Sequence, residues 1–217
     1  MQKIDKTVIL STSYETWEKD LETNNKPHDK YNSSQHKFYY DIVMNLFHCQ
    51  KGLCAYTEVL LCAENLYKED KWKNGVYVKD WGKTTPYNGS LDHFDPDLKS
   101  KKGETGIKDW LWDNFFMAET DTNRRKSTQK VDVKFKPDNP NYSPELYLTY
   151  DKVLDKFNAK DDLSDDLKEQ VKDMLKVLGI NHPTIIRKRA QTLKSHFGYG
   201  CLHNEFPTAI RFYENEL

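Results

Sequence analysis

A carboxylate and an imidazole stand next to each other at Asp92 and His93, between the turn-forming pair Asn88-Gly89 and Pro96. An imidazole has a reference pKa of ~6.5, so at neutral pH it can accept a proton from a water molecule. The same imidazole can equally be a packed, hydrogen-bonded side chain at the end of a strand. An Asp-His pair by itself therefore carries no functional signal.

Two further polar groups follow the pair in order along the chain. Asn114 comes first, in "WDN", and Asn123 follows nine residues later, in "NRRK". That interval leaves room for one short strand over "FFMAE" and a turn, which would bring Asn123 to the first turn of a helix facing His93. A strand ending in Asp-His, a loop with Asn, a second strand and a helix opening with Asn-x-x-Lys together predict a ββα hairpin.

The N-terminal half must supply elements that support this hairpin. Residues 33–52 have apolar residues at helical spacing, with Ser34 as a cap and Gly52 after the end, and predict a helix. The run "LCAYTEVLLC" favours a short strand, and the segment around "GVYV" predicts a short hairpin between loops that contain glycine.

The C-terminal third predicts two helices. One is capped by Ser164 and stops at Gly179, and the other begins at Pro183 and stops at Gly198. We expect them to pack as an antiparallel pair over residues 163–198. Before them, residues 131–150 carry three prolines and predict an extended, irregular crossover.

Length and composition bound the class of protein. The chain has 217 residues, 37% of them apolar and 31% charged, which fits a single domain over residues 1–217. No segment approaches the ~20 apolar residues of a membrane span, and the N-terminal apolar run is too short for a secretory segment. We therefore expect a cytoplasmic protein with no membrane contact and with its four cysteines reduced.

The ordered set at positions 92, 93, 114 and 123 resembles the HNH endonuclease family, whose ββα-metal fold binds one divalent cation. "GLCAYTE", "IDKTVILSTSYETW" and "LGINHPTIIRKRAQTL" are similar to segments of one subgroup. That subgroup contains the nuclease components of Septu-type and some retron-type anti-phage systems, which work with an ABC-type ATPase. The resemblance implies an α+β fold in which a ββα-metal core at 88–130 is elaborated by N-terminal and C-terminal helices.

The resemblance also implies a role for each residue of the set. His93 would be the general base, and Asn114 would hold the loop and the His93 backbone by hydrogen bonds. Asp92 and Asn123 would give oxygen ligands to Mg²⁺ or Mn²⁺, and Mg²⁺ keeps several waters and so needs few protein ligands. In the plainer alternative, Asp92 is a strand-end acid, Asn123 a helix cap and Asn114 a turn former.

The sequence departs from the subgroup at the positions of a structural zinc. Members often carry two CxxC pairs, but the matching positions here read Cys54 and Thr57, then Glu119 and Thr122. Threonine does not replace a zinc thiolate, so we expect no structural zinc. Four aromatic residues are expected to hold the hairpin by packing instead: Trp110, Trp112, Phe115 and Phe116.

Basic residues gather around the hairpin. Residues 99–136 hold ten Lys/Arg and six acids, a local balance of +4 in a chain whose net charge is -1. Such a run can be a solvated face, or it can contact DNA phosphates without reading sequence. The residues expected to bind DNA are Arg124, Arg125, Lys126, Lys101 and Lys102.

The residues at positions 92, 93, 114 and 123 and the resemblance together predict a divalent-metal-dependent endonuclease that cleaves DNA. The resemblance further implies that it is the nuclease subunit of an ATPase-containing anti-phage defence complex. A different class of function stays open: a catalytically silent HNH-like subunit that binds protein or DNA. The absence of the zinc ligands is the sequence feature that favours it. A third interpretation, an α-helical interaction protein with a chance Asp-His pair, would show no ββα hairpin.

Overall fold

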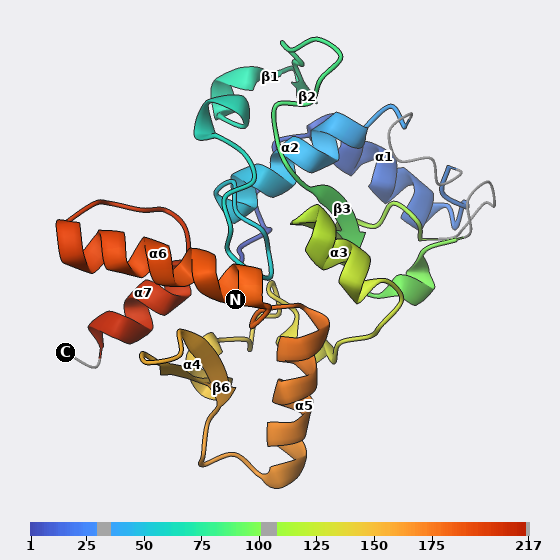
Figure 1. The fold of residues 1–217 in the computed structure, drawn as a ribbon. Helices are drawn as coiled ribbons and strands as arrows, with labels where there is room; N and C mark the ends of the chain where they lie inside the picture. Colours follow the sequence, from blue (N-terminus) through green and yellow to red (C-terminus); the bar gives the residue numbers. More distant parts are fainter. Residues whose placement is uncertain (30–35, 101–107, 216–217) are drawn as a thin grey trace.

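The computed structural model describes residues 1–29, 36–100 and 108–215, in which helices alternate with antiparallel strand pairs (Figure 1). The α-helices are α1 (Thr12–Thr23), α2 (Tyr39–Gln50), α3 (Thr120–Lys126), α4 (Pro144–Tyr147), α5 (Asp165–Val177), α6 (Pro183–Tyr199) and α7 (Pro207–Glu214). The strands are β1 (Trp72–Lys73), β2 (Val76–Tyr77), β3 (Ser90–His93), β4 (Phe115–Ala118), β5 (Leu148–Asp151) and β6 (Lys156–Ala159). The protein is therefore α+β, as predicted.

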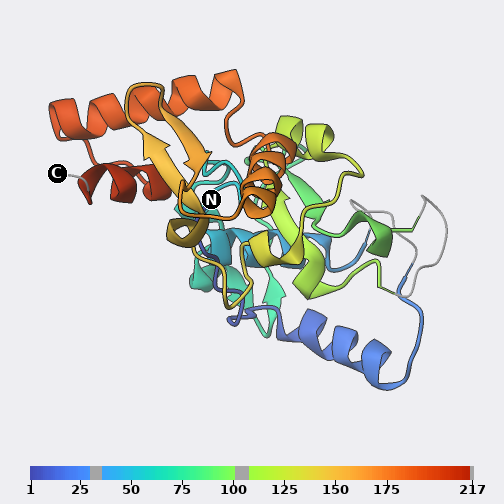
Figure 2. The ribbon, with the colours of Figure 1, turned by 90° about the horizontal axis from the view of Figure 1, so that it is seen from below.

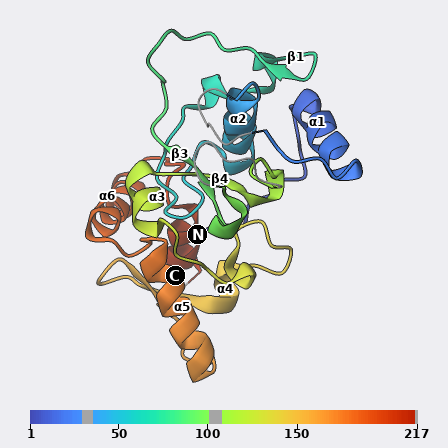
Figure 3. The same cartoon turned by 90° about the vertical axis from the view of Figure 1, so that its right-hand side faces the viewer.

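The strand pair β3–β4 occupies the centre of the molecule, and α3 follows it directly. Leu91 pairs with Met117 and His93 with Phe115 in antiparallel register. Helix α2 packs against β4 and α3 packs against β3, so the pair lies between two helices (Figure 3). The chain thus runs strand, strand, helix through residues 90–126, which excludes an all-helical protein.

Aromatic side chains form the core around this unit. Each buried aromatic ring contributes roughly 1.5–3 kcal/mol relative to exposure, and dense packing here limits how the hairpin can move. The four aromatic residues that we expected to hold the hairpin are all buried: Trp110, Trp112, Phe115 and Phe116.

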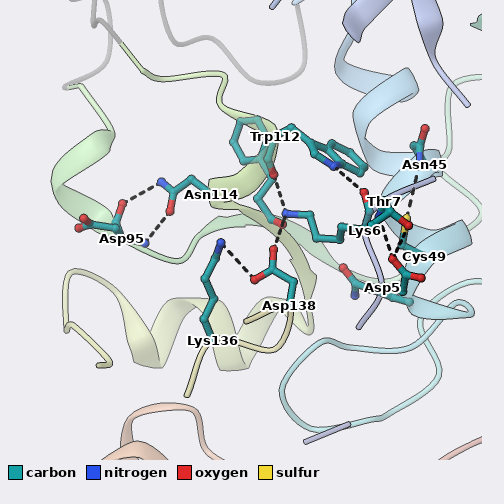
Figure 4. A network of polar contacts seen from close by, with 12 residues as sticks. Asp5, Lys6, Thr7, Asn45, Cys49, Asp95, Trp112, Asn114, Lys136 and Asp138 are labelled. Carbon is teal, nitrogen blue, oxygen red and sulfur yellow. Dashed lines mark hydrogen bonds and ion pairs between the residues drawn. The ribbon is translucent and has the colours of Figure 1, made fainter. Parts of the chain in front are cut away.

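A buried lysine from the N-terminal segment fixes the turn that precedes β4. Lys6 donates from Nζ to the carbonyl oxygens of Trp112, at 2.6 Å, and Phe115, at 3.1 Å. Its ammonium also lies 3.3 Å from the carboxylate of Asp138, as Figure 4 shows. Burial lowers the pKa of Lys6 to about 8, while Asp138 opposes that effect. Lys6 thus ties the N-terminus to the loop between the two strands.

The predicted elements of the N-terminal half are present in part. Helix α2 begins at Tyr39, and the predicted cap Ser34 lies outside the described residues. The β1–β2 pair is the predicted hairpin. The run "LCAYTEVLLC" is wrong as a strand, because it forms tight turns closed by one isolated bridge between Leu53 and Leu60.

The C-terminal region differs most from the prediction. Helix α5 packs on β6 while α6 packs on α7, and the axes of α5 and α6 cross steeply in Figures 1 and 2, so the antiparallel pair is wrong. The β5–β6 hairpin and α7 were not predicted. Gly198 lies within α6, and the helix ends at Gly200, whose left-handed φ of 67° terminates it. Gly179, with φ 64°, follows α5 as predicted.

The buried Arg189 predicts a large effect on stability. It donates to the carbonyl oxygens of Asp155, at 2.8 Å, and Ile180, at 2.7 Å. Arg189→Met removes both charge-assisted bonds and leaves two buried carbonyls without that donor, so we expect a loss of about 2–4 kcal/mol in unfolding free energy by urea denaturation. Arg187→Met, at an exposed position of the same helix, should change it by less than about 0.5 kcal/mol. Equal losses of unfolding free energy in the two variants would show that the hydrogen bonds of Arg189 do not stabilise the fold.

Candidate active site

Three of the predicted site residues line one cavity. Its volume is about 310 Å³, and it lies between the end of β3, the turn at 96–100 and α3. Strand β3 contributes Asp92 and His93, and α3 contributes Asn123. The lining is completed by Leu91, Pro96, Lys99, Ser100, Ser127 and Thr128.

His93 is a buried, neutral imidazole. Only 4% of the residue is exposed, its ring meets Phe115 edge to face, and burial lowers its pKa to about 4. Its Nε2 lies 3.0 Å from the carbonyl oxygen of Asp109. Because a carbonyl can only accept, Nε2 carries the proton, and Nδ1 of the neutral ring has the lone pair that a general base needs.

Asp92 points toward α3 and is held by two donors. Tyr56 donates from its hydroxyl to Oδ2 at 2.5 Å, and Lys126 lies 3.2 Å from both carboxylate oxygens. Burial raises the pKa of Asp92, whereas the ammonium of Lys126 and the hydroxyl of Tyr56 act to lower it. The carboxylate is thus already balanced by a cation of the chain itself.

Lys126 is fully buried at the end of α3, contrary to the DNA-contacting role that we predicted for it. Besides contacting Asp92, it donates to the carbonyl oxygen of His93 at 2.7 Å. The side chain therefore faces β3 and not solvent. In the sequence "NRRK" this lysine cannot be distinguished from the two arginines before it. The sequence therefore gave no indication that its side chain is buried.

Asn123 links α3 to β3 through its amide nitrogen. Nδ2 donates to the hydroxyl of Ser90 at 2.8 Å and to the carbonyl of Leu91 at 3.2 Å, and the amide oxygen takes part in neither bond. That oxygen and the Asp92 carboxylate are hard donors of the kind that Mg²⁺ prefers, so the chemistry of the donor set fits. A cation there would share Asp92 with Lys126.

Asn114 holds the turn that follows His93, as Figure 4 shows. Its side-chain oxygen accepts from the backbone nitrogen of Asp95 at 2.7 Å, and its Nδ2 donates to the Asp95 carbonyl at 3.0 Å. The backbone of Phe94 donates to the Asn114 carbonyl at 2.8 Å. Asn114 thus holds the loop by hydrogen bonds, as expected, but its bonds go to the backbone of residues 94 and 95. The carbonyl of His93 itself accepts from Lys126.

Four positions lie close together at the start of α3: Cys54, Thr57, Glu119 and Thr122. They are the positions that correspond to the zinc ligands of the HNH subgroup that the sequence resembles. The sulfur of Cys54 accepts from the backbone nitrogens of Thr57, at 3.5 Å, and Glu119, at 3.3 Å. Thr122 donates to the Glu119 carboxylate at 3.3 Å. Burial raises the pKa of the Cys54 thiol, which is free like the other three cysteines. Hydrogen bonds thus join these positions.

The remaining predicted DNA contacts differ from one another. Arg124 is exposed and pairs with Asp121 at 2.8 Å. Arg125 is partly buried and donates to Thr122 at 3.1 Å. Lys101 and Lys102 lie outside the described residues.

Comparisons with protein-family models, with curated proteins and with solved structures found no match for this chain. Within the described ranges, no three or more His, Cys, Asp or Glu side chains are grouped so that they could hold a metal ion. Nor is any helix there long and apolar enough to cross a bilayer.

The ion pair of Asp92 and Lys126 predicts strong coupling in stability. Lys126→Met leaves a buried carboxylate without its counter-charge, so we expect a loss of about 3–5 kcal/mol. The double variant Asp92→Asn/Lys126→Met removes both charges and should lose at least about 1 kcal/mol less than the sum of the single losses. Urea denaturation of the four proteins measures this cycle, and additive losses would show that the pair is not coupled.

The neutral state of His93 predicts a loss of stability in acid. The imidazole has a pKa of ~6.5 when unfolded and about 4 when folded. Between those values the unfolded chain binds a proton that the folded chain does not, so stability falls as pH drops and is unaffected above them. From about pH 7 to about 4.5, wild type should lose about 2–3 kcal/mol more than His93→Gln. Parallel losses in urea denaturation would contradict burial of the neutral ring.

Proposed function

We propose that the chain is a divalent-metal-dependent endonuclease of the HNH type that cleaves phosphodiester bonds of DNA. One observation carries this proposal: a strand, strand, helix unit brings a neutral imidazole, a carboxylate and an amide to the same cavity of about 310 Å³. The order of these residues along the chain is the order that the resemblance in sequence implies.

Phosphodiester hydrolysis needs an activated water and positive charge near the phosphate and the leaving oxygen. Nδ1 of His93 would accept the proton from water, since Nε2 is engaged by the Asp109 carbonyl. Asn114 would fix the direction of the His93 turn through Asp95. A bound Mg²⁺ or Mn²⁺, held by Asp92 and Asn123, would neutralise charge on the phosphate and the leaving group.

The proposed setting is a cytoplasmic anti-phage complex with an ABC-type ATPase. The balance of +4 over residues 99–136 is modest, and the whole chain has a net charge of -1. Such a chain is expected to bind free DNA weakly, because affinity for DNA rises with the number of phosphates neutralised. Delivery by a partner protein would compensate for this, as the resemblance to Septu-type nucleases implies.

A second candidate function is a catalytically silent HNH-like subunit that binds protein or DNA. The observation that favours it is that the Asp92 carboxylate already contacts the Lys126 ammonium and the Tyr56 hydroxyl. A divalent cation would have to compete with that ammonium for the carboxylate. The pKa of about 4 also makes His93 a weak base in the free protein. In this alternative the same contacts serve only to hold the hairpin.

Plasmid cleavage in Mg²⁺ or Mn²⁺ separates the two functions. Wild type, tested alone and with any ABC-type ATPase found encoded next to its gene, should nick DNA, and chelation with EDTA should abolish the activity. His93→Ala should lower the rate about 10²–10⁴-fold, the usual contribution of a general base. His48→Ala, a histidine outside the site, is the matched control and should cleave normally.

Circular dichroism should confirm that both variants are folded. Cleavage that survives His93→Ala would assign the activity to a contaminant or another site. No cleavage by wild type in any of these conditions would favour the silent subunit.

A further inference from the structure

A second cavity, larger than the first, lies against the opposite side of α3. Its volume is about 700 Å³, and α5, β6 and the start of α6 form its other walls. Asn123 lines the candidate active site and Arg125 lines this second cavity. Residues two positions apart in a helix differ by about 200° around its axis. Asn123 and Arg125 therefore point to opposite sides of α3, and the helix contributes to both cavities.

The walls of this cavity carry an excess of positive charge. The basic residues are Arg125 and the α5 lysines at positions 168, 172 and 176, and Asp161 is the one acid among the lining residues. The lysines stand four residues apart and therefore share one face of α5. The acids at 165, 169 and 173 form a neighbouring row, and none of them lines the cavity. The basic row of α5 thus lies on the side of the helix that lines the cavity.

Local ion pairs bind these lysines only weakly. Lys168 lies 3.9 Å from Asp165, and Lys172 lies 3.2 Å from Glu169. Pairs between exposed side chains of this kind contribute about 0–1 kcal/mol each. A phosphate group could therefore draw both ammonium groups away from their neighbours at little cost.

Arg125 is placed at the cavity by a glycine. Gly179 has a left-handed φ of 64°, and a Cβ at that position would lie 3.2 Å from Nη2 of Arg125. The guanidinium donates to Thr122, and its buried Nε has no hydrogen-bond acceptor in the part of the chain that the structure describes. A planar guanidinium with donors to spare suits the oxygens of a phosphate.

We propose that this cavity, which we name the α5 cleft, binds phosphates of the DNA backbone beside the candidate active site. The inference rests on the proposed function for the identity of its ligand. The lysine row spans about 12 Å at 1.5 Å per residue, the length of several phosphates along one strand of a duplex at 3.4 Å each. Contacts of this type add affinity without reading sequence.

Charge reversal in the α5 cleft tests this. Binding of a short fluorescein-labelled DNA duplex, and of its single strand, is followed by fluorescence anisotropy in EDTA so that no cleavage occurs. Lys172→Glu/Lys176→Glu should raise Kd at least about tenfold and reduce the slope of log Kd against log salt by about 2, because two phosphate contacts are lost.

The matched control is Lys19→Glu/Lys26→Glu, on α1 and in the loop that follows it, which changes the same charge at two exposed, ion-paired lysines. It should alter Kd less than twofold. Equal weakening by both double variants, or no binding by wild type, overturns the inference. So does tighter binding of a fluorescent nucleoside triphosphate than of DNA.

Plasmid cleavage by the same preparations keeps the two proposals apart. If the α5 cleft variants bind DNA poorly while wild type binds it and fails to cleave, the inference stands and the nuclease proposal fails. If wild type cleaves and the α5 cleft variants bind and cleave normally, the inference alone fails.

Discussion

A buried ion pair between Asp92 on β3 and Lys126 on α3 determines how the helix sits on the strands. Removing two charges from water costs several kcal/mol per ion, so such a pair is tolerated only when every charged group finds further partners. Here the Asp92 carboxylate accepts a further hydrogen bond from the Tyr56 hydroxyl, and the Lys126 ammonium donates a further one to the His93 carbonyl. With α3 held in this rotation, Asn123 must face β3 and Arg125 must face the opposite side. One residue of α3 is thereby placed at each of the two cavities beside it.

The imidazole and the turn after it are held by groups from three other parts of the chain. The carbonyl of Asp109 sets the tautomer of His93, and the amide of Asn114 closes the turn after it. Lys6 in turn fixes the loop that carries Asn114, although more than one hundred residues separate the two. A site held in this way is preorganised, since Asp109, Asn114 and Lys6 are themselves buried.

The parts of the fold that could be predicted from sequence are those with local causes. The Asn88-Gly89 pair before β3, the apolar "FFMA" and the polar start of α3 each indicate an element boundary or type within a few residues, and their order predicted the strand, strand, helix unit. The burial of Lys126 has no local cause, because it depends on the rotation of α3 against β3. The crossing of α5 and α6 could not be predicted either, because an apolar helix face shows that the helix packs against something but not which element covers it. The β5–β6 hairpin escaped notice because β5 begins within residues 131–150, whose three prolines predicted an irregular crossover, and four-residue strands give only a short alternating pattern.

The same ion pair also separates the two candidate functions. A divalent cation held by Asp92 would have the same sign of charge as Lys126, and at short range within a protein such repulsion amounts to several kcal/mol. An anion entering the cavity offsets this repulsion, and a DNA phosphate is such an anion. In an enzyme built on this site, cation and DNA would therefore strengthen each other's binding, and the free protein would hold the cation weakly. In a silent subunit no anion enters, and Lys126 remains the permanent counter-charge of Asp92. The buried ammonium is thus compatible with catalysis only when substrate supplies the missing negative charge.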